Sequence, residues 1–295
     1  MHKYILILLF APIFLACNGS NKSHGDSDQK KVFTVTIETQ RYFLDQITGG
    51  NFTINTLVPP GTSPETYEPA PSVIMNMSKS ELYFKVGDLG FEKAWSARLA
   101  QNNPNMAIID CSEGIELIEN EDHHHSGSHA GHNHGAMDPH VWSSPLAVKI
   151  FTQNMLEGVV SIDPENEDFY RSNFEEFLGK VDSVDQVISN ILVDSPTRSF
   201  IIYHPALGYF AHDYDLHQHS IEFEGKSPSP AQMRGLIDIA RDENISTVFI
   251  QKGFDAKNAE VVAREIGADV FEIDPLSYNW DEELIRIASL IAREK

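Results

Sequence analysis

The chain has 295 residues, with 22 Lys and Arg against 43 Asp and Glu, so its formal net charge at pH 7 is −21. This acidity argues against nucleic acid as a partner, because binding to phosphates requires clustered basic side chains. Hydrophobic residues make up 41% of the chain, which is enough to bury a core, and two cysteines are too few for a disulfide scaffold.

The N-terminus has the features of an export signal. Lys3 precedes an apolar run that ends at residue 16 and is too short for a permanent membrane span. The residues FLAC at 14–17 resemble a bacterial lipobox, in which the cysteine, here Cys17, is lipidated and becomes the mature N-terminus. The alternative is an ordinary signal peptide with a chance cysteine. Polar residues 18–31 then form a flexible tether, and Cys111 is expected to be an unpaired, buried thiol.

Strand and helix patterns alternate along the rest of the chain. Strands are predicted at residues 32–37, 52–58, 82–86 and 106–110, and again at 199–203, 218–223, 247–251 and 270–273. Helices are predicted between them at residues 42–48, 72–80, 91–101, 206–214, 231–243 and 256–266. This alternation predicts an α/β fold with two similar lobes, residues 32–162 and 193–295, each built on a parallel sheet.

One long helix is predicted to link the lobes, over residues 163–192, with Asp163 as its N-cap and Pro164 in its first turn. Its apolar residues recur at spacings of four and three, which defines a single stripe: Tyr170, Phe174, Phe177, Val181, Val184, Ile188 and Ile191. About 28 helical residues span roughly 42 Å, enough to run along both lobes. A coiled-coil seam is the alternative, but paired charges beside the stripe are lacking.

A histidine-rich segment, EDHHHSGSHAGHNHG, occupies residues 121–135. Its six imidazoles lie among Gly, Ser and acidic residues, a composition typical of an exposed loop: His123, His124, His125, His129, His132 and His134. Imidazole suits zinc, copper and nickel better than magnesium or calcium. We interpret the loop as an auxiliary collector of metal, and an incidental low-complexity insertion is the alternative.

Four candidate metal ligands follow predicted strands or lie in loops rich in proline. Glu65 lies in PPGTSPETYEP after the second strand, and His140 lies in DPHVWSSP, where Asp138 could accept its second N–H. His204 and Asp274 each end a strand in the second half and precede a proline. Open α/β sheets bind ligands at the carboxyl ends of their strands, so these positions converge on the cleft between the lobes.

The chain resembles the metal-binding solute receptors of bacterial ABC importers, the zinc and manganese class. The matching stretches are PPGTSPETYEPAPS (59–72), the acidic histidine loop, DPHVWSSP (138–145), YHPALGYFAHDYDL (203–216), the segment 227–254 and IDPLS (273–277). The resemblance implies two lobes, each with a four-stranded parallel sheet, bridged by one long helix, with the metal between them. It also implies an ABC permease with its ATPase as partner, and a protein that acts as a monomer.

The same resemblance assigns ligand positions to His140, His204 and Asp274, while Glu65 stands where the family usually has histidine. Either Glu65 ligates as a carboxylate, which we favour, or water replaces it. Histidine at position 204 and the loop indicate Zn(II), whereas two histidines with two carboxylates leave Mn(II), or iron, possible. We therefore predict a non-enzymatic zinc receptor, exported and lipid-anchored at the periplasmic or cell-surface side of a membrane.

Two other functions compete with this prediction. An exported zinc hydrolase would keep an open metal position beside a general base, but no HExxH motif is present in the sequence. A surface adhesin would rest on the lipid anchor and would tolerate loss of His140.

Overall fold

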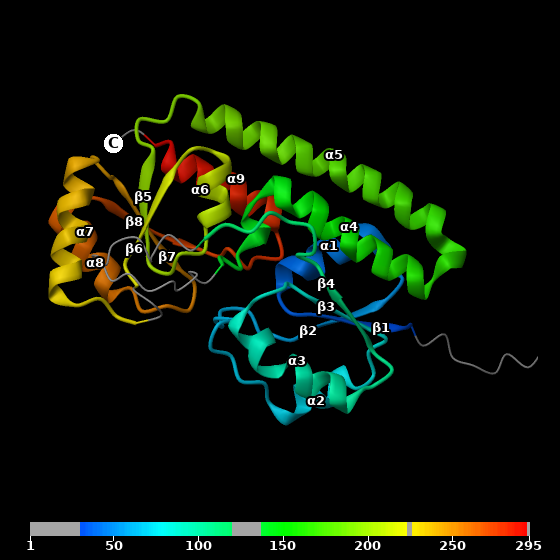
Figure 1. Ribbon diagram of the computed structural model, residues 1–295. Coiled ribbons are helices and arrows are strands. Elements are labelled where there is room, and N and C mark those ends of the chain that lie inside the picture. The colour runs from blue at the N-terminus through cyan, green and yellow to red at the C-terminus, as the bar shows by residue number, and fades with distance from the viewer. Residues whose placement is uncertain (1–29, 120–136, 223–225, 294–295) are drawn as a thin grey trace, which may run out of the picture.

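A computed structural model describes the protein over residues 30–119, 137–222 and 226–293. These residues form two four-stranded parallel sheets, as predicted (Figure 1). The first sheet has the order β2-β1-β3-β4 and consists of β1 (Val32–Val35), β2 (Thr53–Thr56), β3 (Leu82–Lys85) and β4 (Ala107–Asp110). The second has the equivalent order β6-β5-β7-β8 and consists of β5 (Ser199–Ile202), β6 (His217–Ser220), β7 (Thr247–Gln251) and β8 (Asp269–Ile273).

Six helices lie close to their predicted positions: α1 (Glu38–Thr48), α2 (Pro71–Met77), α3 (Gly90–Asn102), α6 (Gly208–Asp213), α7 (Pro230–Asp242) and α8 (Lys257–Ile266). Two further helices, α4 (Pro145–Ile162) and α9 (Trp280–Ile291), were not predicted. Neither lies between two strands of one sheet, so the alternation of strand and helix gave no reason to expect them. Both pack against the long helix, and α4 follows a short 3₁₀ turn, η2 (Val141–Ser143).

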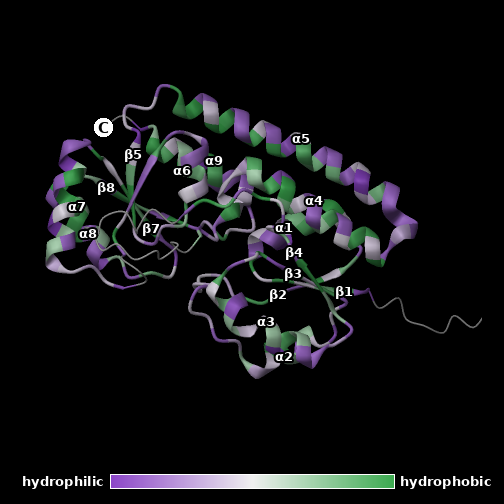
Figure 2. Ribbon diagram, in the orientation of Figure 1, coloured by the Kyte–Doolittle hydropathy of each residue, from purple (hydrophilic) through white to green (hydrophobic). Residues whose placement is uncertain are grey.

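The long helix, α5, spans Glu167–Leu192 and so begins four residues later than predicted. The reason is that α4 ends at Ile162 and Asp163 caps it, after which Pro164–Asn166 form a separate 3₁₀ turn, η3. The 26 residues of α5 extend about 39 Å and pack against α1 and α4 of the first lobe and α9 of the second. Its stripe is buried as predicted, except that Leu192 replaces Ile191 as the last fully buried residue. Hydrophobic and hydrophilic residues alternate along it in Figure 2.

One hydrophobic core contains residues from both lobes, and the buried stripe of α5 is part of it. Phe43 of α1 packs against both Phe177 of α5 and Trp280 of α9, with ring centroids 5.8 and 5.3 Å apart. A hydrogen bond also connects the lobes: the indole N–H of Trp280 donates to the carbonyl of Trp142 at 2.7 Å. The lobes are therefore fixed to one another by apolar contacts and by buried polar ones.

Cys111 is fully buried, as predicted for an unpaired thiol. Within the residues that the structure describes, no helix is both long and apolar enough to cross a bilayer.

Candidate metal centre

His140 lies in the first lobe, on the turn that leads into η2 and α4. Only 4% of the residue is exposed, and its Nδ1 lies 2.7 Å from Oδ1 of the buried Asp138. The same carboxylate oxygen accepts the backbone N–H of His140 at 2.8 Å, so the ring and the backbone are held together. Since a carboxylate can only accept, Nδ1 carries the hydrogen and Nε2 keeps its lone pair. The predicted hydrogen bond between Asp138 and His140 is therefore present, and it aims the lone pair of Nε2 away from Asp138.

Burial of the ring lowers the pKa of His140, but the charge and hydrogen bond of Asp138, together with the more distant charge of Glu65, outweigh it. The pKa of His140 consequently lies above its ordinary value of 6.5. Carboxylates that favour a cation on the imidazole also favour a metal ion there.

His204 follows β5 in the second lobe, at the point where the strand order reverses and where open sheets bind ligands. Its backbone forms two hydrogen bonds with the side-chain amide of Gln251, the last residue of β7. Its ring stacks on Phe254 with an interplanar angle of 13°, and its Nδ1 lies 3.1 Å from Oε2 of Glu222. The sequence analysis singled out His204 as a candidate ligand, but it did not identify Gln251, Phe254 or Glu222 as its neighbours.

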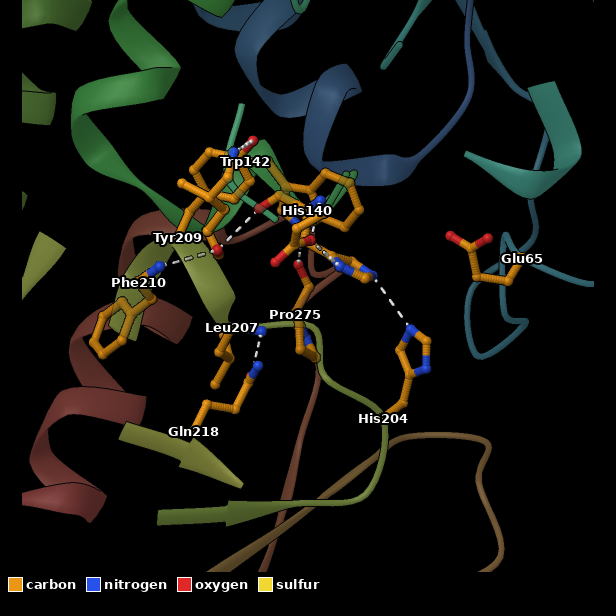
Figure 3. Close-up of polar contacts among 12 residues, drawn as sticks. Glu65, His140, Trp142, His204, Leu207, Tyr209, Phe210, Gln218 and Pro275 are labelled. Carbon is orange, nitrogen blue, oxygen red and sulfur yellow. Dashed lines mark hydrogen bonds and ion pairs between the residues drawn. The ribbon is translucent and has the colours of Figure 1, made fainter. Parts of the chain in front are cut away.

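The two histidines meet across the interface between the lobes. Nε2 of His204 lies 3.3 Å from Nε2 of His140, and Figure 3 shows the two rings pointing toward each other. The segments that carry them are more than sixty residues apart in sequence. Tertiary structure therefore brings together two of the four predicted ligands.

Asp274 follows β8 and lines the same cavity as the two histidines. The cavity has a free volume of about 40 Å³, and loops after β2, β5, β7 and β8 form its walls. The carboxylate of Asp274 lies 3.6 Å from Nζ of Lys252, and the backbone N–H of Asp274 donates to the side chain of Glu283 at 2.7 Å. The cavity is thus large enough for a small ion and a water molecule. Lys252 is paired with the Asp274 carboxylate, which is the group that a cation in the cavity would contact.

Glu65 lies in the loop after β2, across the gap from the histidine pair (Figure 3). Its Oε2 accepts the backbone N–H of Gly90, the first residue of α3, at 3.0 Å. Its Oε1 is buried and has no hydrogen-bond partner. A buried carboxylate oxygen without a partner costs about 1–3 kcal/mol or more, so this atom would gain from a cation.

Across residues 30–119, 137–222 and 226–293, no three His, Cys, Asp or Glu side chains already form a closed metal site. His140 and His204 are in contact and Asp274 borders their cavity, whereas Glu65 does not line that cavity and lies apart from the two histidines. Cys17 and the six histidines of residues 121–135 lie outside the described residues.

The comparisons with known proteins agree with this architecture. The family model of the periplasmic component A of the zinc-uptake complex matches residues 33–286. The high-affinity zinc uptake system protein ZnuA of Bacillus subtilis (strain 168) is 29% identical over 292 residues, which cover 95% of this chain and 91% of that protein. The manganese ABC transporter substrate-binding lipoprotein PsaA of Streptococcus pneumoniae is 26% identical over 282 residues, or 90% of this chain and 87% of that one.

Solved structures give the same result. A crystal structure of ZnuA is 38% identical, with a TM-score of 0.82, and the match covers 89% of this chain and 98% of that one. A deletion mutant of ZnuA with zinc bound is 36% identical, with a TM-score of 0.81, and the match covers 90% of this chain and 100% of that one. Because the family model spans most of the sequence and the fold agrees with it, the chain belongs to the family of periplasmic A components of zinc-uptake complexes.

Proposed function

We propose that the protein is an exported receptor that captures Zn(II) outside the cytoplasmic membrane and delivers it to the permease of an ABC importer. The observation that carries this proposal is the 3.3 Å separation between Nε2 of His140 and Nε2 of His204. Tetrahedral zinc with Zn–N bonds of about 2.0–2.1 Å requires two nitrogens about 3.3–3.4 Å apart. The histidine pair therefore has the spacing that a zinc ion requires of two of its ligands.

Asp274 and Glu65 complete the proposed ligand set. Asp274 already borders the cavity, and it would exchange its contact with Lys252 for the metal. Glu65 would contribute Oε1, the oxygen without a partner, while Oε2 stays on Gly90. Both carboxylates must move toward the histidines, since the described residues do not form a closed site without metal.

Manganese is the second candidate cargo, because two imidazoles and two carboxylates are harder as a set than three imidazoles. Its support from the comparisons is the similarity to the manganese lipoprotein of Streptococcus pneumoniae. The zinc-uptake family and the spacing of the histidine pair favour zinc.

Two further parts of the proposal concern residues outside the described structure. We propose that Cys17 carries a lipid that anchors the receptor to a membrane. We also propose that the histidines of residues 121–135 collect zinc weakly and raise its concentration near the cleft.

Competitive calorimetry with Zn(II) and Mn(II) tests the cargo and the ligands. We expect one tight zinc ion per chain in the wild type and in a variant lacking residues 121–135. His204→Ala should lose it, because one imidazole of the pair is removed. His219→Ala is the matched control, since this histidine of β6 contacts Glu243 at 2.8 Å instead of the cavity. Glu65→Ala should weaken zinc binding.

Each alternative outcome has a definite meaning. Tighter binding of Mn(II) than Zn(II) would replace the proposed cargo. Undiminished zinc binding in His204→Ala would place the site elsewhere, and undiminished binding in Glu65→Ala would remove Glu65 from the ligand set.

A further inference from the structure

We propose that Glu222 is a positioning residue that holds His204 in the tautomer and orientation required for zinc, as Asp138 does for His140. This inference rests on the proposed function and deepens it. Each lobe then contributes one carboxylate–imidazole pair: Asp138 with His140 in the first lobe and Glu222 with His204 in the second.

The register of the second sheet places Glu222 beside His204. Strands β5 and β6 are parallel, with Ile202 opposite Ser220. Their pairing continues past both strands, because the backbone N–H of Glu222 donates to the carbonyl of Tyr203 at 2.9 Å. Two residues beyond Ile202 is His204, and two beyond Ser220 is Glu222. Residues two apart face the same side of a sheet, so the two side chains lie together.

The contact between the two side chains determines which nitrogen carries the hydrogen. Nδ1 of His204 lies 3.1 Å from Oε2 of Glu222, and an ionised carboxylate can only accept a hydrogen bond. Nδ1 must therefore donate, which leaves the lone pair on Nε2. That atom faces Nε2 of His140, which has lost its hydrogen for the same reason. When both rings are neutral and held in this way, two lone pairs face each other across 3.3 Å, and a cation between them, either a proton or a metal ion, relieves their repulsion.

The other neighbours of His204 hold it without selecting a tautomer. Gln251 bonds only to its backbone, and Phe254 stacks on the face of its ring at a centroid distance of 5.8 Å. Neither contact is with Nδ1. The orientation of the lone pair therefore depends on Glu222, whose side chain is 12% exposed and so largely shielded from competing water.

The test replaces the carboxylate with an amide of the same shape. In Glu222→Gln the amide can turn its NH₂ group toward Nδ1, which favours the opposite tautomer and draws the lone pair away from the cavity. We expect zinc affinity of the full-length protein to fall about 10- to 100-fold, the range typical of such partners of metal-binding histidines. Glu243→Gln is the matched control, because it removes the same charge from a carboxylate–imidazole pair formed with His219. Its zinc affinity should stay within about twofold of the wild type.

A second measurement does not require metal. Nitrogen NMR of the imidazoles, in zinc-free wild-type protein above the histidine titration range, should show His204 with its hydrogen on Nδ1; His204→Ala identifies the signal. In Glu222→Gln this signal should shift toward the Nε2–H form, whereas in Glu243→Gln it should not. This readout distinguishes positioning from a merely structural role, and its wild-type measurement decides the tautomer even if a variant folds poorly.

The outcomes separate the inference from the proposed function. If wild-type protein binds no zinc, the proposed function fails while the tautomer result still decides the role of Glu222. If zinc binds but Glu222→Gln matches Glu243→Gln in affinity, the inference is wrong. It is equally wrong if the wild-type His204 carries its hydrogen on Nε2, or if X-ray absorption shows that Glu222→Gln removes an oxygen ligand from zinc.

Discussion

Gly90→Ala should weaken zinc binding although Gly90 is not one of the proposed ligands. Gly90 begins α3, and its backbone N–H holds Oε2 of Glu65. A Cβ atom at this position would lie 2.5 Å from the carbonyl oxygen of Glu65 and 2.8 Å from Oε2. Both distances are below any real carbon–oxygen contact, and the nearer atom is backbone that cannot rotate away.

The size of the effect follows from these distances. Ordinary contact begins at 3.4 Å, so the Glu65 loop must retreat by about 0.9 Å. Ligands must be held within about 0.5 Å of their productive positions, so a shift of this size displaces Glu65 from the proposed site. We expect a 10- to 100-fold loss of zinc affinity, which corresponds to about 1.4–2.8 kcal/mol.

Calorimetric titration of zinc-free protein measures this loss, with Gly179→Ala as the control. Gly179 lies in α5, and a Cβ there would meet nothing within 4 Å, so affinity should be unchanged. In a Glu65→Ala background, Gly90→Ala should have no further effect, because the ligand that it displaces is already absent. Affinity within twofold of the wild type in Gly90→Ala would refute the reasoning, as would a full additional loss in the double variant.

Four further predictions concern pH, stability and localisation. Zinc affinity should fall as pH decreases, beginning above pH 6.5, because Asp138 raises the pKa of His140 and a protonated ring cannot bind the metal. Zinc titrations from pH 5.5 to 8 measure this decrease, and an affinity that does not change with pH would contradict it. The raised pKa also means that His140 contributes stability to the zinc-free fold below pH 6.5 and loses it as pH rises through the folded-state value, which thermal unfolding would detect. Trp142→Phe should cost about 1–3 kcal/mol in urea unfolding, because the carbonyl of Pro275 loses the indole N–H that reaches it at 2.9 Å; an unchanged midpoint would show that this bond between lobes is dispensable. Cys17→Ser should move the protein from the membrane fraction to the soluble exported fraction, whereas retention in the membrane would exclude lipidation at this residue.

The central strands were predictable because parallel strands buried on both faces are short, apolar and rich in β-branched residues, whereas the edge strands are partly exposed. All eight were predicted within about three residues, and β5 and β7 are buried along their whole length. The predicted start of α5, residue 163, lies four residues before the observed start at Glu167. Asp163 caps the end of α4, and Pro164 begins the 3₁₀ turn η3. A capping pattern alone cannot distinguish the end of one helix from the start of the next.

The candidate site was only partly predictable. His140, His204 and Asp274 stood out because each lies next to a proline and the last two end a predicted strand, and the structure places all three around one cavity. Glu222 and Lys252 gave no local signal. Their importance depends on which strand pairs with which, and strand order is a property of the whole sheet.

Residue type and spacing along the chain were enough to predict the alternation of strand and helix, the apolar stripe of α5 and the kinds of side chain available for a metal. Tertiary structure alone decided that Nε2 atoms from two lobes lie 3.3 Å apart and that a carboxylate lies behind each imidazole. It also decided that Glu65 lies apart from the pair, held by the first residue of α3. The physical reason is that distances across a cleft depend on how α5 and the shared core orient two separately folded sheets, and no local pattern encodes that orientation.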